Sequence, residues 1–338
     1  MADWLQKQWV GYSIWQIFLL PLSFVFFVLS VVRKILFQSG VFRVQRLPVP
    51  VIVVGNISVG GTGKTPLVIW LAEQLQQAGL KPGIISRGYG GSATGVCEVF
   101  EDSLPHRVGD EPLLLAKRTR CPVFIGTHRV GAGLALLKAH PEVNVIISDD
   151  GLQHYRLHRD VEIAVVDAQR GFGNGLLLPA GPLREARRRL NSVDAVVMTN
   201  TSLSSSNAGS VAPVFDMHLA GSMFISLFDG KSQHAVEFFK GKALVALAGI
   251  GNPKRFFDTL SGMGLDFDHK SFADHHAFTP QDLLPFVGKT ILMTEKDAVK
   301  CEQFLKGDAQ HDIWVLPVSA NIESGLKELV LQKLATEK

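Results

Sequence analysis

The stretch Ile52-Val53-Val54-Gly55-Asn56-Ile57-Ser58-Val59-Gly60-Gly61-Thr62-Gly63-Lys64-Thr65 decides the fold. Its apolar beginning, its glycines and its closing Lys-Thr predict a buried strand, a phosphate-binding loop and the start of a helix. Four glycines permit positive φ angles and close backbone approach, so successive N–H groups can point at one anion. The helix expected from about Thr65 to Ala78 presents its positive end to that anion. The stretch therefore predicts a nucleotide-binding site.

The chemistry of a phosphate cradle assigns roles within this loop. We expect Lys64 to reach the β- and γ-phosphates and the Thr65 hydroxyl to hold Mg²⁺. Ser58 stands where the pattern G-x-x-x-x-G-K-[ST] begins with glycine, although nearby glycines keep the loop flexible. A tight strand-to-helix turn with an exposed lysine is the alternative, which fits the closing Gly-Gly-Thr-Gly-Lys-Thr less well. The residues expected at the nucleotide are Ser58, Gly60, Gly61, Thr62, Gly63, Lys64 and Thr65.

The composition suits a two-domain α/β protein. At 338 residues the chain is long enough for two domains, each with its own core. Apolar residues make up 46% and charged residues 19%, as in a globular protein with some membrane contact. A net charge of +3, without basic runs interleaved with aromatics, does not indicate nucleic-acid binding. Cys97, Cys121 and Cys301 lie far apart without metal-ligand spacing, which predicts reduced thiols on the cytosolic side.

Apolar runs alternate with helical patterns from Pro50 to about Asn200. Because the apolar runs are continuous rather than alternating, they favour a mostly parallel sheet covered on both faces. The fold class predicted is α/β, with a P-loop NTPase-like α/β/α core whose ligands bind beyond the carboxyl ends of the strands. Strands are expected at Val51–Val54, Pro82–Ser86, Val123–Ile125, Asn144–Ser148, Ile163–Asp167 and Ala195–Thr199, and helices at about Thr65–Ala78, Asp110–Arg118 and Val130–Ala139.

A polar segment from Thr201 to about Gly209 predicts a surface linker and a domain boundary. A second, smaller α/β pattern follows it, and Gly249-Ile250-Gly251-Asn252 is expected to connect a strand to a helix. Its expected strands are Met223–Phe228, Gln233–Phe238, Ala243–Ala248, Lys289–Met293 and Ile313–Pro317, with helices near Lys254–Met263 and Gly325–Ala335. The predicted division is 1–46 for an N-terminal membrane-associated helix, 47–205 for the nucleotide-binding lobe and 206–338 for a C-terminal lobe that contributes to the active site.

The N-terminal segment predicts membrane attachment. Ile14 to Val32 form 19 consecutive uncharged positions, long enough as a helix to span about 30 Å. Arg33, Lys34, Arg43 and Arg46 follow the run, which by the positive-inside tendency keeps the main body cytoplasmic. Two arrangements stay open: a single spanning helix, or a helix that lies in the interface of one leaflet. A hydrophobic helix packed on the soluble body is the remaining alternative.

Two acids at the end of a predicted strand indicate a metal site. The apolar run Val143 to Ile147 leads into Ser148-Asp149-Asp150. A carboxylate at a strand end beside the phosphate loop is how P-loop enzymes hold Mg²⁺ or its water shell. Paired acids at such a place repel each other unless a cation lies between them. The alternative is an Asp-Asp-Gly turn that simply leaves the strand.

Phosphoryl transfer also needs a group that takes the proton of the acceptor hydroxyl. Candidates near strand ends are Asp110, the pair His275 and His276, and Arg184 with Glu185. Spacing alone does not choose among them, since Asp110 also suits the start of a helix and a histidine pair is more often structural.

Further motifs accompany the phosphate loop and its preceding Gly55-Asn56. Together they resemble the tetraacyldisaccharide 4'-kinases, the membrane-associated lipid A kinases of Gram-negative bacteria. The resemblance runs from the N-terminal helix to about Ala320, and Ser58 is compatible with the family's variant of the loop. The motifs are Ser86-Arg87-Gly88-Tyr89-Gly90-Gly91, Gly109-Asp110-Glu111-Pro112, Asp149-Asp150-Gly151-Leu152-Gln153-His154, Leu178-Pro179-Ala180-Gly181-Pro182-Leu183-Arg184-Glu185, Asp274-His275-His276 and Thr294-Glu295-Lys296-Asp297.

The resemblance implies an activity, cofactors and a location. The γ-phosphate of ATP would pass to the 4'-hydroxyl of tetraacyldisaccharide 1-phosphate, giving lipid IVA at the cytoplasmic face of the bacterial inner membrane. ATP and Mg²⁺ are the implied cofactors. The lipid A precursor and the membrane surface are the implied partners, with no nucleic acid and no obligatory protein partner.

The resemblance also implies roles for single residues. Asp110 would be the catalytic base, assisted by His275, with His276 left as the alternative. Lys64 would act on the phosphates during catalysis, and Thr65, Asp149 and Asp150 would form the metal site. Glu185 is expected to support that metal site. The residues expected in the nucleotide or phosphate surroundings are Gln153, His154, Tyr89 and Arg184.

Two other functions stay open at this point. A membrane-tethered regulatory P-loop NTPase would also need the phosphate loop, and Thr294-Glu295-Lys296-Asp297 loosely resembles a guanine-reading motif. An ATP-dependent ligase or synthetase would release ADP and phosphate without a phosphorylated sugar. Nucleotide consumption that depends on lipid favours the kinase, whereas guanine selectivity with a partner-dependent rate favours the regulatory NTPase.

Overall fold

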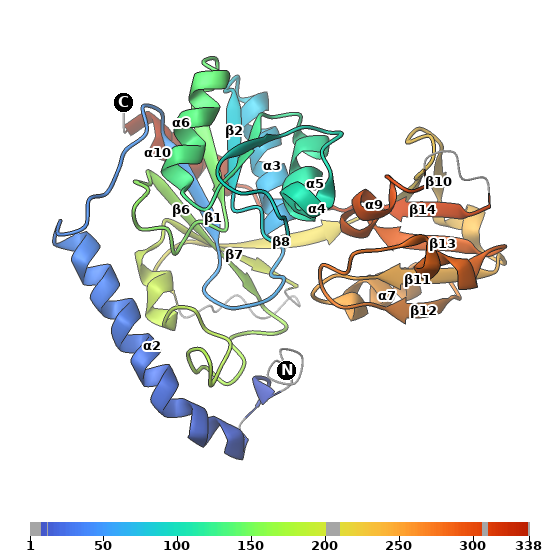
Figure 1. The fold of residues 1–338 in the computed structure, drawn as a ribbon, viewed down its shortest axis with the longest axis horizontal. Helices are drawn as coiled ribbons and strands as arrows, with labels where there is room; N and C mark the ends of the chain where they lie inside the picture. Colours follow the sequence, from blue (N-terminus) through green and yellow to red (C-terminus); the bar gives the residue numbers. More distant parts are fainter. Residues whose placement is uncertain (1–7, 12, 201–209, 306–309, 337–338) are drawn as a thin grey trace.

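The computed structural model describes residues 8–11, 13–200, 210–305 and 310–336. In these ranges the strands form two sheets, which lie in two lobes side by side (Figure 1). The larger sheet has nine strands in the order β15-β8-β7-β6-β1-β5-β2-β4-β3, and the smaller has six in the order β10-β9-β14-β13-β11-β12. The expected linker Thr201–Gly209 lies outside the described residues.

The larger sheet is parallel at its centre and buried on both faces. Its strands are β1 (Val51–Gly55), β2 (Pro82–Ser86), β3 (Cys97–Val99), β4 (Val123–Ile125), β5 (Val145–Asp149), β6 (Val161–Asp167), β7 (Ala195–Thr199), β8 (Val214–Ala220) and β15 (Ser319–Ile322). Only β3 and β15, at the two edges, run antiparallel to their neighbours. In β1, Ile52 and Val54 pack into one apolar cluster and Val51 and Val53 into another on the opposite face. Burial on both faces explains the continuous apolar strands.

Helices cover both faces of this sheet and complete the predicted α/β/α layers. One face carries α3 (Lys64–Gln77), α5 (Asp110–Thr119) and α10 (Leu326–Thr336), whose apolar residues share a single core cluster. The other face carries α6 (Arg129–Ala139). A short helix, α4 (Pro105–Val108), leads directly into α5. The fold class expected from the sequence is thereby confirmed.

The smaller lobe is a second α/β layer with its own two core clusters. Strands β11, β12, β13 and β14 run parallel, and β9 pairs antiparallel with both β14 and β10. The elements are β9 (Met223–Ser226), β10 (Gln233–Ala235), β11 (Leu244–Ala248), α7 (Pro253–Gly262), β12 (Asp268–Ser271), α8 (Pro280–Leu283), β13 (Thr290–Thr294), α9 (Glu295–Cys301) and β14 (Asp312–Leu316). The Gly249–Asn252 run connects β11 to α7, as expected.

The expected domain boundary between residues 205 and 206 does not separate the strands of the two sheets. Strands β8 and β15 and helix α10 all lie beyond residue 206, yet they belong to the larger sheet and its core. Leu326, Val330 and Leu334 of α10 are buried against the nucleotide-binding lobe. The chain therefore leaves the first lobe after β8 and returns to it at β15. The helix expected at Gly325–Ala335 exists, but it packs on the first lobe.

The N-terminal helix α2 (Ile14–Gln38) runs alongside the larger lobe (Figure 1). Its two buried residues, Gln16 and Ser23, are polar, and Ser23 Oγ donates to Leu177 O and accepts from Ala180 N, both at 2.9 Å. Most of its large apolar side chains are exposed to solvent instead. Among the described helices, α2 alone is long and apolar enough to cross a membrane. This distribution is the reverse of that in a helix packed onto a soluble core.

Candidate active site

The phosphate loop joins β1 to α3 at the centre of the larger sheet. Asn56, which is fully buried, donates its side-chain amide to Thr62 Oγ1 at 3.2 Å and to Gly60 O at 3.4 Å. Thr199 Oγ1, at the end of β7, donates to Thr62 O at 3.1 Å. These bonds hold the loop from inside and from β7, which is separated from β1 by β6 in the sheet. The predicted loop residues Ser58 to Thr65 therefore meet at the N-terminus of α3.

A second segment, 182–185, lies along the outer side of this loop. Val59 N donates to Pro182 O at 2.8 Å, and Arg184 N donates to Ile57 O at 2.7 Å. This pairing brings the Arg184 side chain to Asp150, where Nη1 lies 3.0 Å from Oδ2. Arg184 thus lies beside the phosphate loop, and its contact with the nucleotide stays a prediction.

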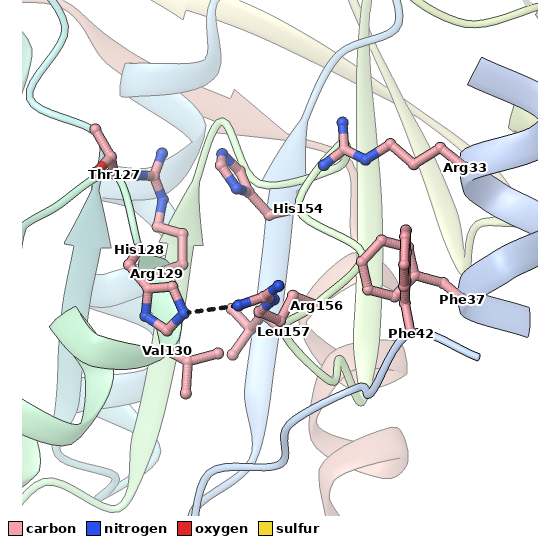
Figure 2. A pocket seen from close by; sticks show the side chains of 10 residues that line it. All are labelled: Arg33, Phe37, Phe42, Thr127, His128, Arg129, Val130, His154, Arg156 and Leu157. Atoms are coloured by element: carbon pink, nitrogen blue, oxygen red, sulfur yellow. Dashed lines mark hydrogen bonds between the residues drawn. The ribbon is translucent and has the colours of Figure 1, made fainter. Parts of the chain in front are cut away.

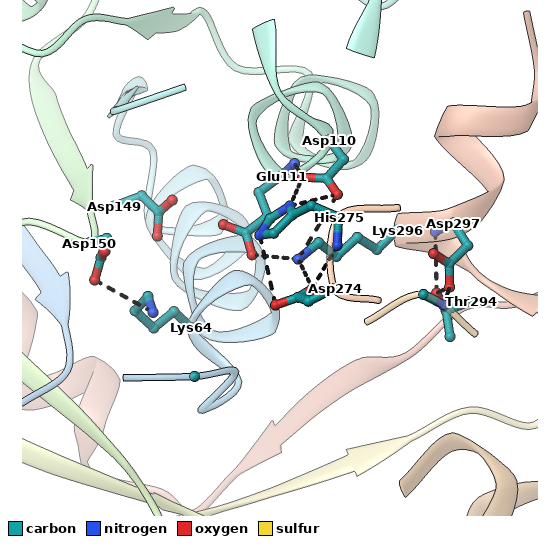
Figure 3. A network of polar contacts seen from close by, with 12 residues as sticks. Lys64, Asp110, Glu111, Asp149, Asp150, Asp274, His275, Thr294, Lys296 and Asp297 are labelled. Atoms are coloured by element: carbon teal, nitrogen blue, oxygen red, sulfur yellow. Dashed lines mark hydrogen bonds and ion pairs between the residues drawn. The ribbon is translucent and has the colours of Figure 1, made fainter. Parts of the chain in front are cut away.

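Asp150 lies opposite the catalytic lysine candidate. Lys64 Nζ is 3.5 Å from Asp150 Oδ1 (Figure 3), and the Asp150 backbone takes a positive φ of 47°. Burial acts to raise the pKa of Asp150, but the charges of Lys64 and Arg184 lower it to about 2. Asp150 is therefore ionised at every working pH.

Of Asp149 and Asp150, Asp149 has fewer hydrogen bonds to its carboxylate. Its side chain accepts from Ser86 Oγ at 3.0 Å through Oδ2, while Oδ1 has no hydrogen-bond partner among the described residues. Burial, with the charge of Glu111, raises the pKa of Asp149 to about 6. A nearby cation would relieve this unfavourable burial of charge.

The donor atoms at this place fit Mg²⁺. The carboxylates of Asp149 and Asp150 and the hydroxyl of Thr65 are hard oxygen donors, and Mg²⁺ in nucleotide sites takes few protein ligands beside phosphate oxygens and water. The unpaired buried oxygen of Asp149 is consistent with such a ligand. Among the described residues, no three His, Cys, Asp or Glu side chains converge as a ready-made metal cluster.

Glu185 is engaged elsewhere. Its carboxylate accepts hydrogen bonds from Gln153 Nε2 at 2.7 Å and from the Tyr155 hydroxyl, and it lies 3.4 Å from Arg189 Nε. Gln153 Nε2 also donates to Asn56 O at 3.0 Å. Both residues thus belong to a bonded network behind the phosphate loop, and the structure does not bring Glu185 to Asp149 and Asp150. Its support of the metal site stays a prediction.

The structure joins Asp110 to His275 across the two lobes. His275 Nδ1 lies 3.0 Å from both carboxylate oxygens of Asp110 (Figure 3), and Asp110 is only 5% exposed. Asp110 begins α5 immediately after Gly109, whose φ is +92° and where a Cβ would lie 2.6 Å from Tyr89 O. Only glycine fits there, so the loop after β2 and the start of α5 fix the carboxylate in place.

His276 points elsewhere. Its Nε2 lies 3.2 Å from Asp282 Oδ2 within the smaller lobe, and its ring stacks on Phe272 at 4.6 Å. The structure therefore brings His275, the residue chosen from the sequence, to Asp110. Tyr89 lies beside this pair, with its ring centroid 5.1 Å from that of His275, and its expected place in the nucleotide or phosphate surroundings stays a prediction.

Asp110 and His275 shift each other's pKa values. The hydrogen bond to Asp110 raises the pKa of His275 above its usual value, although burial and the charge of Lys296 oppose this. Burial acts to raise the pKa of Asp110, but the bond from His275 and the charge of Lys296 outweigh it and lower that pKa. Asp110 is thus a weak base, while the His275 imidazole accepts a proton more readily than an ordinary histidine.

A cationic cavity of about 350 Å³ lies between α2 and the loop after β5 (Figure 2). His154, expected in the nucleotide or phosphate surroundings, lines this cavity, and burial with the charge of Arg129 lowers its pKa to about 4. Arg129 is buried, and its Nη2 lies 3.4 Å from Asp149 O at the end of β5. The lining residues with basic side chains are Arg33, His128, Arg129, His154 and Arg156.

Sequence reasoning missed the charged groups that surround Asp110. Lys296 and Lys300, on α9, lie 4.0 and 3.9 Å from Asp110 Oδ2. Lys296 also contacts Glu111 and Asp274 (Figure 3). In the sequence, these two lysines lie four positions apart just after a predicted strand, with Lys296 inside the Thr294–Asp297 motif and Lys300 beyond it. This spacing is the signal that could have identified them. Nothing in the sequence indicated that Arg129 would be buried.

Comparisons with known proteins agree with this geometry. The family model for tetraacyldisaccharide-1-P 4'-kinase matches residues 15–335. A tetraacyldisaccharide 4'-kinase of Methylobacillus flagellatus is 47% identical over 334 residues, which are 98% of this chain and 96% of the relative. One of Aromatoleum aromaticum is 51% identical over 319 residues, covering 94% and 93%. The crystal structure of LpxK from Aquifex aeolicus, described as an "apo" form in complex with ATP, matches with a TM-score of 0.81 at 30% identity, covering 95% of this chain and 100% of that one.

Gly60 provides a test of the phosphate loop. Its φ is +107°, a region that costs an L-residue about 1–2 kcal/mol. A Cβ there would lie 2.7 Å from Arg170 Nη1, which can swing aside, so backbone strain dominates. We expect Gly60→Ala to weaken ATP binding about tenfold, measured by calorimetric titration.

Gly79→Ala is the matched control. Gly79 follows the C-terminal end of α3, away from the phosphate loop, its φ is +81°, and a Cβ there meets nothing within 4 Å. The control carries similar backbone strain outside the site and should bind ATP nearly as the unmodified protein does. Equal affinities for the two variants would show that the loop does not bind phosphate in this conformation.

Proposed function

The chain belongs to the tetraacyldisaccharide-1-P 4'-kinase family, and we propose that it transfers the γ-phosphate of ATP to the 4'-hydroxyl of tetraacyldisaccharide 1-phosphate, giving lipid IVA for lipid A biosynthesis. The observation that carries the proposal is the contact of Asp110 and His275 across the lobes, in the same site as the phosphate loop. A phosphate cradle alone suits any nucleotide hydrolase. A buried acid–histidine pair beside it supplies what an alcohol acceptor needs.

The nucleotide half of the site positions and neutralises the phosphates. The loop N–H groups, the N-terminus of α3 and Lys64 hold the β- and γ-phosphates, and Arg184 adds a second positive charge beside Asp150. On nucleotide binding, Lys64 exchanges its contact with Asp150 for a phosphate oxygen. Asp149, Asp150 and Thr65 would hold Mg²⁺, which when bound neutralises charge on the transferring phosphoryl group.

In the acceptor half, His275 takes the proton of the 4'-hydroxyl. Its Nδ1 faces Asp110, and its Nε2 makes no hydrogen bond among the described residues, the nearest acid oxygen being Asp274 Oδ2 at 3.8 Å. Asp110 holds the imidazole in this tautomer and stabilises the imidazolium that forms. The resemblance implies Asp110 as the base with His275 assisting it; we propose the reverse division, because both carboxylate oxygens of Asp110 face His275 Nδ1 and the pKa of Asp110 is lowered.

The cationic cavity suits the acceptor's phosphate. Arg33, Arg129 and Arg156 surround a space that α2 borders on the membrane side, and Arg129 Nε has no hydrogen-bond partner among the described residues. A lipid phosphate there would be paired by guanidinium groups while the acyl chains follow the exposed apolar side of α2. The neutral His154 can donate one hydrogen bond without adding charge.

Helix α2 attaches the protein to the cytoplasmic face of the inner membrane, and its contacts favour the interfacial arrangement. Ser23, Phe27, Arg33 and Phe37 all touch the larger lobe, through hydrogen bonds, an Arg188 contact and a Tyr155 ring contact. These positions extend over about 20 Å of helix. A helix held to a polar lobe over this length cannot be surrounded by hydrocarbon there, so its outer apolar face enters one leaflet.

The function is tested by transfer of labelled γ-phosphate from ATP to tetraacyldisaccharide 1-phosphate in mixed detergent micelles with Mg²⁺. We expect a labelled lipid that disappears in Lys64→Ala, because the lysine stabilises charge on the transferring group. ATP hydrolysis that persists without any labelled lipid would point to the membrane-tethered regulatory NTPase.

The pH profile decides which group is the base. His275 must be neutral to accept a proton, so kcat/KM should rise with pH through the raised pKa of His275, with an acid limb above pH 6.5. Asp110→Asn removes the cause of that shift, so its acid limb should move to lower pH while the rate falls by about 10²–10⁴. An acid limb of the unmodified enzyme below pH 4 would return the role of base to Asp110.

The membrane arrangement is tested by deletion and labelling. Removal of residues 1–32 should reduce recovery in the membrane fraction, because it removes most of the exposed apolar face. A cysteine introduced at Ala2 should resist an impermeant thiol reagent added to intact spheroplasts. Rapid labelling from outside would show that α2 spans the bilayer.

A further inference from the structure

Helix α9 is embedded in both lobes. Ala298 and Cys301 belong to a core cluster of the smaller lobe, whereas Val299 packs into a core cluster of the larger lobe. Ion pairs join its ends to α5, between Glu295 and Arg118 and between Glu302 and Lys117. The helix therefore forms a fixed bridge at the junction of the lobes (Figure 1).

Lys296 projects from this bridge into the centre of the acidic cluster. Its Nζ lies 3.0 Å from Glu111 Oε1, 3.4 Å from Asp274 Oδ1 and 4.0 Å from Asp110 Oδ2 (Figure 3). Two of these acids come from the larger lobe and one from the smaller lobe. Burial acts to lower the pKa of Lys296, but Glu111 and the other acids outweigh it and raise that pKa. The ammonium therefore stays charged throughout the working pH range.

The same helix also fixes a turn at the phosphate loop. Asp297, which is fully buried, accepts from Gly249 N at 3.0 Å, and Lys300 Nζ donates to Gly249 O at 3.3 Å. This turn brings Gly251 so close to the phosphate loop that a Cβ on Gly251 would lie 3.3 Å from Gly61 N. One helix thus places both the charge beside Asp110 and the contact with the loop.

We propose that Lys296 is a positioning residue for the kinase reaction, which draws Asp110 and His275 together from the two lobes and keeps the imidazole in its neutral, proton-accepting form. The inference rests on the proposed function. Without Lys296, three carboxylates would face one histidine with only Lys300 to offset them. An imidazole in that field holds its proton more tightly, so less of the enzyme is ready to accept a proton.

The sign of each expected pKa shift follows from the charges that face the Asp110–His275 pair and Lys296. Loss of a positive charge raises the pKa of His275 and thus moves the acid limb of kcat/KM to higher pH, while loss of a negative charge does the opposite. The groups are Asp110 and Glu111 from α5, Tyr89 from the loop after β2, Asp274 from the histidine's own loop, and Lys296 and Lys300 from α9.

The experiment measures kcat and KM for labelled phosphate transfer across pH in Lys296→Met, Lys296→Arg and Lys117→Met. Lys117 is the matched control, since it joins the same two helices through Glu302 without contacting Asp110. In Lys296→Met we expect the acid limb to rise by about half a unit to one unit, with kcat reduced about tenfold below that limb. Lys296→Arg keeps the charge and should restore the acid limb, and Lys117→Met should leave it unchanged.

Asp274→Asn is expected to shift the acid limb of kcat/KM in the opposite direction, and it tests the inference if Lys296→Met does not fold. Its acid limb should move to lower pH, because a negative charge near the imidazole is lost. An acid limb of Lys296→Met within about 0.2 units of the unmodified enzyme would overturn the inference while the kinase stands. If Lys296→Met does not fold, an acid limb of Asp274→Asn at the same pH as that of the unmodified enzyme would also overturn the inference. No lipid phosphorylation by the unmodified enzyme would overturn the proposed function and this inference with it.

Discussion

The contact between His275 and Asp110 is the interaction on which the rest of the site depends. The phosphate loop, Lys64 and both candidate metal ligands belong to the larger lobe, whereas the histidine belongs to the smaller one. Asp110 is fixed by the first turn of α5, and His275 reaches it from a backbone position with a φ of +58°. A site divided in this way is complete only when the lobes are in contact. Such an arrangement excludes water from a reactive phosphate until the acceptor is in place.

Charge balance explains why so many lysines and acids meet here. Asp110, Glu111, Asp149 and Asp150 all come from the larger lobe, and they would repel each other in a buried site. Lys64 offsets Asp150, and the two lysines of α9 offset Asp110 and Glu111. Of these four acids, Asp149 alone keeps a buried oxygen without a hydrogen-bond partner among the described residues. It is therefore the place where an added cation would stabilise the site most.

The sequence predicted the parts of the fold and site that depend on local patterns. The strand, loop and helix from Val51 to Gln77 appear within one or two residues of the expected bounds, because glycine geometry and apolar burial are encoded locally. Strands β8 and β15 were not expected, since they are partly exposed and lack a continuous apolar run. The return of α10 to the larger lobe, and the meeting of Lys296 with Asp110, depend on contacts between residues that lie far apart in the sequence. No local pattern reports such contacts.

Helix α2 and the phosphate loop are joined by consecutive hydrogen bonds. Arg33 of α2 donates to Gln153 O at 3.2 Å, Gln153 Nε2 donates to Asn56 O at 3.0 Å, and Asn56 holds Thr62 inside the loop. These hydrogen bonds fix the position of the phosphate loop relative to α2, and no conformational change has to pass between them. With the helix in one leaflet, the loop stands at a constant height above the lipid surface. An acceptor whose acyl chains stay in that leaflet then meets the phosphate loop with its headgroup at one depth, which removes part of the orientational cost of the reaction.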